Sequence, residues 1–330
     1  MRPQVPGYGA LVERALAWAR RRRERVRGYN PWEIAVHTVR AAVDHRLTGH
    51  AAEMSFFALL TLVPSTVAVG AALGFLERFV GPQQIARGQD EAIAALRLLM
   101  SPRLTDEVIA PFVRAQLSQQ RGGVALGGLV LTWWLSSHLF ASTSHALDRA
   151  YGVKDRRPTL TQRFIALGFA LGSVVVVALT LGVLVVGPLG GGPDIAERLG
   201  LGRAVALAWS LARWPALLLI LIGFLICLHR FSPNTEHSWK DCVPGAALGV
   251  ILWVVAAAGF RIYLGLGGGV TRGFALQDQT VAVIGRAVGA VVATVLWTYF
   301  SSMAILIGGE LNAELARVRR RMRDPGDGGV

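Results

Sequence analysis

Four residues near the middle of the chain have side chains that can bind zinc. They follow the spacing C-x-H-x7-H-x4-C and are Cys227, His229, His237 and Cys242. Thiolate and imidazole are the usual zinc ligands, but the common zinc modules space them differently. Both cysteines are also expected at helix ends. We therefore expect no metal and no cofactor, and metal analysis of the purified protein tests the alternative.

Three arginines lie in or beside apolar stretches and could bind an anionic group: Arg213, Arg261 and Arg286. An arginine at membrane depth costs roughly 2.5–3.5 kcal/mol, so it needs a partner, a watery cavity or a short reach to the surface. Arg213 lies roughly 13 Å inside its apolar helix. Because guanidinium groups bind phosphate through paired hydrogen bonds, we interpret the three as one outward-facing site for an anionic headgroup. Alternatively, Arg261 and Arg286 reach outer-leaflet phosphates, and Arg213 bonds carbonyl groups freed by Pro215.

A second set of ionisable residues could form an inner polar cluster: Glu53, His145 and Glu310. Each stands near the inner end of an apolar stretch, so the alternative is that each simply reaches the membrane interface. Two prolines, Pro64 and Pro215, stand inside apolar stretches. Since proline removes a backbone hydrogen bond, both are candidate helix kinks.

These residues must be positioned by helices that cross a membrane. The 330 residues are 53% hydrophobic and only 17% charged, which is too apolar for an ordinary soluble domain. A bilayer core about 30 Å thick needs roughly 20 apolar residues of helix. The sequence therefore predicts an all-α polytopic membrane protein with six spans, at about 51–76, 122–147, 164–188, 204–228, 243–266 and 285–309.

The distribution of basic residues predicts the orientation of the spans. Loops on the cytoplasmic side retain Lys and Arg. The segments 1–50, 148–163, 229–242 and 311–330 hold 22 basic residues, whereas 76–121, 189–203 and 267–284 hold 9. We therefore expect a multi-pass protein of the bacterial inner membrane with both termini in the cytoplasm, and the formal net charge of +13 largely reflects this asymmetry.

Three regions lie outside the predicted spans. Residues 1–50 form a basic amphipathic helix, with Leu11 and Trp18 on one side, and then a second helix that begins at Asn30 and Pro31 and leads into the first span. Residues 77–121 form an outer helical segment, either a packed cap or a lid. Residues 311–330 form a basic tail. The four arginines at 20–23 are explained by anionic lipid, so we expect no nucleic-acid partner.

Glycines four residues apart occur in four of the predicted spans. Such pairs let helix backbones approach each other, either within one chain or in a homo-oligomer. The pairs are Gly123 and Gly127, Gly168 and Gly172, Gly245 and Gly249, and Gly285 and Gly289. We take them as indicating close packing.

Three stretches resemble the YihY/virulence factor BrkB family of bacterial inner-membrane proteins. They are AAEMSFFALLTLVPS (51–65), HRFSPNTEHSWKDCVPGAALGVILW (229–253) and AVVATVLWTYFSSMAILIGGELNAEL (290–315). The resemblance covers about residues 30–318 and departs from the family at His229, where an aromatic residue is more usual. It implies six spans with both ends inside. The family was formerly labelled ribonuclease BN-like, envelope or lipid transport has been proposed for some members, and it supplies no catalytic residues.

Together these features favour a transporter or permease-like protein for an anionic or amphiphilic envelope substrate such as a lipid. The alternative is a structural or virulence-associated membrane scaffold. We expect no enzyme: metal-dependent RNA cleavage needs clustered carboxylates or histidines, and the seven histidines are scattered along the chain. No nucleotide-binding motif indicates that ATP drives the protein.

Overall fold

The computed structural model describes residues 8–22, 30–80, 122–153, 157–189, 202–235, 238–265 and 279–323, together with residues 83, 90 and 93. In this part of the chain all regular structure is helical, as expected. One long helix coincides with each predicted span. These helices are α3 (Leu47–Val80), α7 (Gly122–Tyr151), α8 (Thr159–Leu189), α10 (Gly202–Phe231), α11 (Trp239–Gly265) and α13 (Gln279–Arg323).

Four stretches within the described residues are long and apolar enough to cross a membrane. They are Thr159–Val177, Leu211–Phe231, Trp239–Tyr263 and Val288–Arg320. The count of six spans remains a prediction. The predicted outer segment at 77–121 lies almost wholly outside the described residues. The predicted boundary at 310 is not a break, because α13 continues through it as one helix to Arg323.

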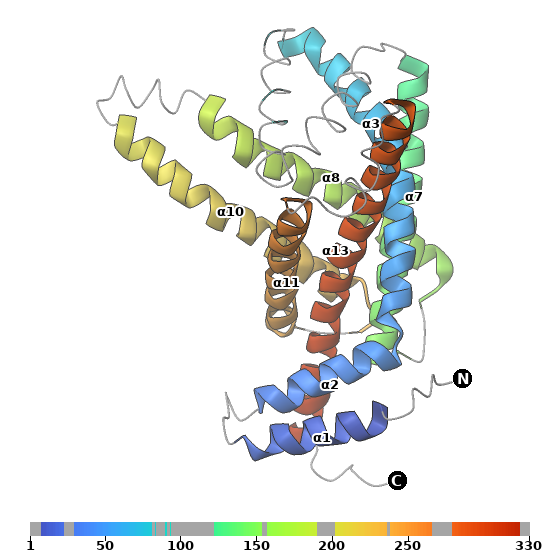
Figure 1. Cartoon of the computed structure of the whole chain (residues 1–330), viewed down its shortest axis with the longest axis vertical. Helices are drawn as coiled ribbons and strands as arrows, with labels where there is room; N and C mark the ends of the chain where they lie inside the picture. Colours follow the sequence, from blue (N-terminus) through green and yellow to red (C-terminus); the bar gives the residue numbers. More distant parts are fainter. Residues whose placement is uncertain are drawn as a thin grey trace.

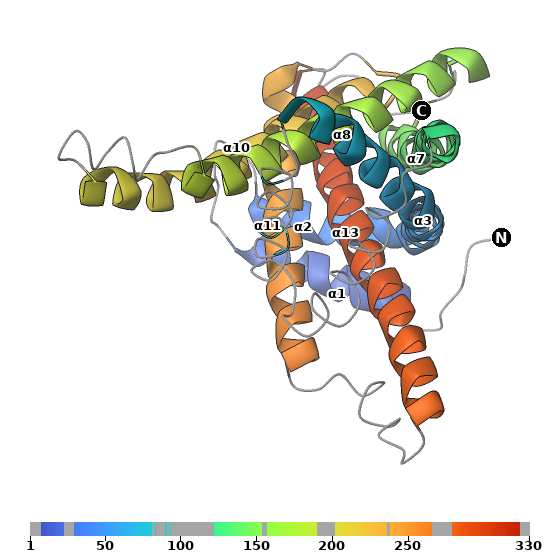
Figure 2. The same ribbon diagram turned by 90° about the horizontal axis from the view of Figure 1, so that it is seen from above.

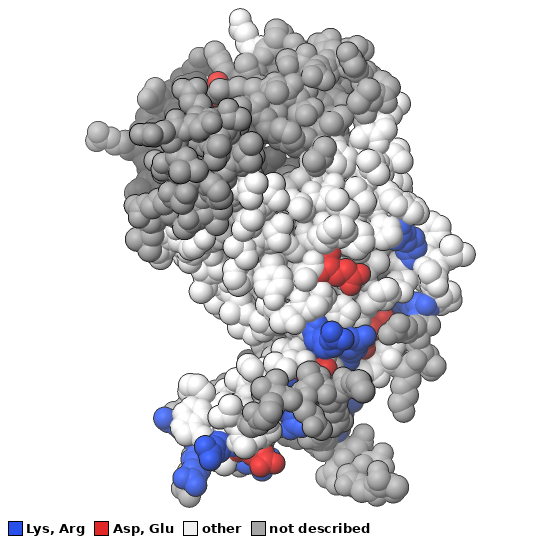
Figure 3. All heavy atoms as spheres, turned by 45° about the vertical axis from the view of Figure 1, so that its right-hand side comes forward, with Lys and Arg blue, Asp and Glu red and all other residues white. Residues whose placement is uncertain are grey.

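Two shorter helices, α1 (Tyr8–Arg21) and α2 (Pro31–Asp44), lie across one end of the molecule beside the C-terminal part of α13 (Figure 1). We call this end the base. On the face shown in Figure 3, charged side chains gather towards the base, and the described surface above them is almost free of charge. This separation fits a base at the membrane surface and an apolar body within the bilayer.

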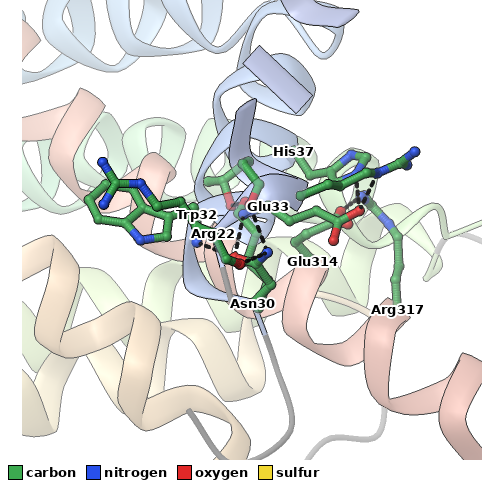
Figure 4. Close-up of polar contacts among 11 residues, drawn as sticks. Arg22, Asn30, Trp32, Glu33, His37, Glu314 and Arg317 are labelled. Carbon is green, nitrogen blue, oxygen red and sulfur yellow. Dashed lines mark hydrogen bonds and ion pairs between the residues drawn. The ribbon is translucent and has the colours of Figure 1, made fainter. Parts of the chain in front are cut away.

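Asn30 starts α2 and ties it to α1, as Figure 4 shows. Its side-chain oxygen accepts hydrogen bonds from the backbone N–H groups of Trp32 (3.1 Å) and Glu33 (3.3 Å), and Pro31 follows it. Its amide group donates to the carbonyl oxygen of Ala19 (2.8 Å), near the end of α1. The predicted start of this helix is therefore confirmed, and one side chain caps both helices of the pair.

A two-residue elbow joins α2 to α3. His45 caps the C-terminus of α2: its backbone N–H donates to the carbonyl oxygen of Ala41 (2.8 Å), and the N–H of Arg46 donates to that of Val43 (3.0 Å). Arg46 has a φ of 56°, the left-handed conformation that reverses the chain direction after a helix. The elbow lets α2 lie across the base while α3 rises from it (Figure 1).

Each long helix packs against two neighbours in the order α3, α7, α8, α10, α11 and α13, and α13 packs back against α3. α8 and α10 extend together away from the other helices in both Figure 1 and Figure 2. α13 also packs against α2 and α7. Two apolar clusters lie between these helices: Leu47, Ala51, Met54, Ala146 and Leu306, and Phe140, Ala166, Ala170 and Leu228.

Candidate functional site

α11 and α13 cross at two glycines near the base. A Cβ atom on Gly245 would overlap the carbonyl oxygen of Gly308, and one on Gly308 would overlap that of Gly245. Only glycine fits at either position without moving a backbone. The close approach of the backbones brings the side chain of Asn312 against the start of α11.

Asn312 joins three helices from a fully buried position. Its side-chain oxygen accepts a hydrogen bond from the N–H of Gly245 (2.7 Å), and its amide group donates to the carbonyl oxygen of Cys242 (3.0 Å). The same amide nitrogen lies 3.2 Å from Nδ1 of His229 on α10. Because buried amides must be paired in apolar surroundings, Asn312 favours one arrangement of α10, α11 and α13.

His229 is completely buried and bonds to α13 through both ring nitrogens. Nε2 lies 3.2 Å from the carbonyl oxygen of Ile305, and Nδ1 faces the amide of Asn312. The contacts fit one neutral tautomer, in which Nε2 donates and Nδ1 accepts. A zinc ion at His229 would have to displace one of these bonds. His237, another residue of the possible zinc set, lies outside the described residues, so the absence of a metal remains a prediction.

Glu310 is the buried acid of the predicted inner cluster. It is 1% exposed, and its Oε1 lies 2.6 Å from Nδ1 of His45 at the α2–α3 elbow. Its Oε2 is buried without a hydrogen-bond partner among the described residues. Glu53 instead has a half-exposed side chain 3.6 Å from His50, and His145 is exposed on α7. The grouping of Glu53 and His145 with Glu310 therefore remains a prediction.

Two titratable groups flank this region beyond the predicted spans. Burial raises the pKa of the Tyr151 phenol well above its usual range, and the nearby Cys242 and Glu310 act in the same direction. Burial lowers the pKa of His50, the cation of Arg149 lowers it further, and the carboxylate of Glu53 opposes the shift. Both groups are therefore held in their neutral forms near pH 7.

The segment between α7 and α8 and the segment after α10 are joined by hydrogen bonds at the base. The carboxylate of Asp148, at the end of α7, accepts a hydrogen bond from the N–H of Asn234 (2.8 Å). Arg157, just before α8, donates to the side-chain oxygen of Asn234 and to the carbonyl oxygen of Phe231, each at 2.9 Å. These contacts explain the sequence FSPN, which begins with the last residue of α10: it binds the end of α10 to the end of α7 and to the segment before α8.

Further hydrogen bonds between helices complete what we call the basal core, the set formed by His45, His229, Glu310 and Asn312 with the helix pairs around them. The hydroxyl of Ser55 on α3 bonds to the carbonyl oxygen of Val295 on α13 (2.9 Å). Ser144 on α7 lies 2.7 Å from Ser232 beyond α10, and the indole of Trp133 donates to the carbonyl oxygen of Leu167 on α8 (3.0 Å). All six long helices are thus joined by side-chain hydrogen bonds.

The predicted arginine site is described only in part. Arg213 is half buried in α10, its Nε is buried without a hydrogen-bond partner among the described residues, and its guanidinium lies 5.4 Å from the ring of Trp214. Arg261 is exposed on α11. The side chain of Arg286 in α13 lies outside the described residues, so the common site remains a prediction.

The two candidate kinks lie inside continuous helices. Pro64 is buried in α3, which changes direction along its course (Figures 1 and 2), and Pro215 is exposed in α10.

The partners that make the basal core were not predicted from the sequence. His45 falls within the predicted second helix of residues 1–50, and Asn312 was not singled out, although it closely follows Gly308 and Gly309 and asparagine often bonds across membrane helices. His229 was considered as a possible zinc ligand and as a departure from the family resemblance, but not as a contact between helices. Its burial explains the departure: it bonds to α13, which an aromatic hydrocarbon ring could not do.

Comparisons with known proteins identify related membrane proteins. A family model described as virulence factor BrkB matches residues 38–328. YfkH of Bacillus subtilis, whose name describes it as ribonuclease-like, is 23% identical over 286 residues, covering 85% of this chain and 94% of that protein. A UPF0761 membrane protein of Pseudoalteromonas translucida is 25% identical over 282 residues, 83% of each chain. No solved structure gives a significant match.

Proposed function

The chain belongs to the virulence factor BrkB family of membrane proteins, and we propose that it moves an anionic, amphiphilic envelope molecule such as a phospholipid between the two sides of a bacterial inner membrane. In this proposal the base faces the cytoplasm with both termini, and the far ends of the helices face outward. The excess of basic residues in the segments at the base supports this orientation.

The observation that carries the proposal is that Arg213 has a buried, unpaired nitrogen among the described residues. It lies in a stretch long and apolar enough to cross the membrane, Leu211–Phe231, and its buried Nε has no hydrogen-bond partner among the described residues. A guanidinium is always charged, so leaving its donors unpaired in apolar surroundings is unfavourable. A phosphate or carboxylate on a passing substrate would pair with it through charge-assisted bonds, with Arg261 and Arg286 as further contacts near the outer surface.

The test uses the purified protein in vesicles of phosphatidylethanolamine and phosphatidylglycerol that contain a fluorescent phosphatidylglycerol. Dithionite, which does not cross the bilayer, bleaches probe molecules only as they reach the outer leaflet. We expect wild-type protein to speed up the bleaching of inner-leaflet probe and Arg213→Ala to slow it by about tenfold. Arg40→Ala, a change on the exposed face of α2, is the control.

Two results would count against the proposal. If wild-type protein gives the rate of protein-free vesicles, phospholipid transport is wrong. If folded Arg213→Ala protein matches the wild type, the assignment of Arg213 is wrong even though transport stands.

A membrane scaffold that holds other envelope proteins is the second candidate. The hydrogen bonds that fix six helices to one another at the base favour it, because a fixed arrangement suits a docking platform. Co-purification of a defined envelope protein, together with the absence of lipid transport, would support this candidate.

We also propose that the chain has no ribonuclease activity, despite the name of one relative. The buried His229 and Glu310 serve contacts between helices, and among the described residues no group of three His, Cys, Asp or Glu side chains is placed to hold a metal ion. Incubation of detergent-purified protein with structured RNA and Mg²⁺ or Mn²⁺ tests this. RNA cleavage that is lost in Glu310→Gln would overturn it.

A further inference from the structure

A cationic site that is separate from the basal core lies between α7 and α8. The guanidinium of Arg163 on α8 bonds to the imidazole of His138 on α7, with 2.7 Å between Nη2 and Nε2. Its central carbon stands 4.1 Å from the ring centre of Trp134, one helical turn before His138. Phe57 of α3 stacks on the ring of His138, with ring centres 5.0 Å apart. The cation is therefore held by neutral and aromatic groups from three helices.

No acidic side chain neutralises Arg163 among the described residues. Glu53 is close enough to interact electrostatically with His138, but its carboxylate lies 3.6 Å from His50 and forms no ion pair with Arg163 among the described residues. A guanidinium has five N–H donors, and a neutral His138 can accept through one ring nitrogen only. Arg163 thus keeps donors available for an anion, and its stacking on Trp134 fixes the direction in which they point.

Arg163 lies near the inner end of one span and beside the interior of another. On α8 it comes directly before the predicted span at 164–188 and four residues after Thr159, or about 6 Å along the helix axis. On α7 its partner His138 lies within the predicted span at 122–147, roughly 13 Å from the inner end, so a bound headgroup would reach the site along the start of α8. Large apolar side chains surround it on the outside: Leu160 is 74% exposed, Phe164 71% and Trp134 52%. In a membrane these side chains would contact acyl chains while Arg163 faces the phosphate layer.

We propose that Arg163, His138 and Trp134 bind the headgroup phosphate of an anionic phospholipid from the leaflet at the base. The phosphate diester accepts two hydrogen bonds from the guanidinium, as arginine–phosphate pairs usually do, and the acyl chains lie over Phe164 and Leu160. An anionic lipid is favoured over a zwitterionic one because the site carries a positive charge without a bonded acid. The site does not depend on transport, and it lies on other helices than Arg213.

The experiment measures lipid binding rather than transport. Full-length protein in detergent is exposed to phosphatidylglycerol or phosphatidylcholine of equal chain length, and bound lipid is counted by native mass spectrometry. We expect preferential binding of phosphatidylglycerol, about tenfold weaker in Arg163→Ala and about threefold weaker in Trp134→Leu, which keeps an apolar side chain but loses the ring. Arg149→Ala, at an exposed position on α7, is the matched control and should bind as the wild type does.

A second measurement keeps the proposal testable if Arg163→Ala does not fold. Wild-type protein is irradiated with a photoreactive phosphatidylglycerol, and we expect crosslinked peptides from 126–140 and 157–171. Arg163→Lys retains the charge but loses the paired N–H donors of the guanidinium, and it should bind phosphatidylglycerol with intermediate affinity. The proposal is overturned by crosslinks that avoid both peptides, by equal binding of the two lipids, or by wild-type binding in Arg163→Ala. Displacement of the lipid by inorganic phosphate alone would assign the site to a free anion instead.

Discussion

Replacing Gly245 with alanine should separate α11 from α13 where they cross. The new Cβ atom would lie 2.0 Å from the carbonyl oxygen of Gly308, whereas real Cβ atoms essentially never come within 3.0 Å of another heavy atom. The difference between these two distances is 1.0 Å, so the helices must part by at least that much or distort. The same Cβ would also overlap the side-chain amide of Asn312.

The stability lost in Gly245→Ala has two sources. Overpacking of a well-filled site costs about 1–3 kcal/mol. A shift of this size also breaks the bonds from Asn312 to Gly245 (2.7 Å) and Cys242 (3.0 Å), and side-chain hydrogen bonds inside membrane proteins contribute about 0.6 kcal/mol each on average. We therefore expect Gly245→Ala to lower the free energy of unfolding by about 2–4 kcal/mol.

The assay is reversible unfolding in mixed micelles with increasing mole fraction of dodecyl sulfate, followed by tryptophan fluorescence. Gly259→Ala is the control on the same helix, because a Cβ there meets nothing within 4 Å. It should leave stability unchanged or raise it by up to about 1 kcal/mol, since alanine is the better helix former. The reasoning is refuted if Gly245→Ala and Gly259→Ala unfold at the same mole fraction of dodecyl sulfate.

Three further predictions use other parts of the molecule. Asn312→Leu leaves the N–H of Gly245 and Nδ1 of His229 unpaired, so the same unfolding assay should show a loss of about 1–3 kcal/mol; an unchanged transition would mean that these bonds do not form. Burial lowers the pKa of His50, so the unfolded chain binds more protons than the folded one. Stability should therefore fall as the pH drops below 6.5, the ordinary value, and His50→Asn should reduce that dependence in thermal melts. Cysteines introduced at 201 and 268 should react with a membrane-impermeant maleimide added outside intact cells; labelling only after lysis would reverse the predicted orientation.

The helices could be predicted from the sequence because their causes are local. An apolar run of sufficient length predicts a helix wherever it lies in the fold, and each predicted span coincides with one. The start of α2 was likewise visible, because Asn30 and Pro31 act on residues directly after them. The ends were less accurate: α8 begins at Thr159, five residues before the predicted span, since polar residues at a helix end remain helical outside the apolar core.

The contacts between helices in the basal core could not be predicted from the sequence in this way. The bond from Glu310 to His45 spans 265 positions, and that from Asn312 to Gly245 spans 67. Nothing in one sequence specifies which polar residues meet across such distances. The sequence therefore identifies Glu310 as an ionisable residue near the inner end of a span, and the inner polar cluster of Glu310, Glu53 and His145 is predicted only because all three lie at that level. The elbow at Arg46 places the preceding residue, His45, within hydrogen-bond distance of Glu310 on α13.

The central position of α13 determines when the molecule can be completed during its synthesis. Ser55, His45 and His229 all bond to this helix, and the ribosome produces it after the other described helices. Until it enters the bilayer, the earlier helices hold these polar side chains without their final partners, so the nascent protein remains loosely assembled. A chain that stops before Asn312 would keep its apolar spans and still enter the membrane, but it would lack the bonds that close the base. We expect cells to remove such a product by proteolysis of the inserted, unfinished bundle.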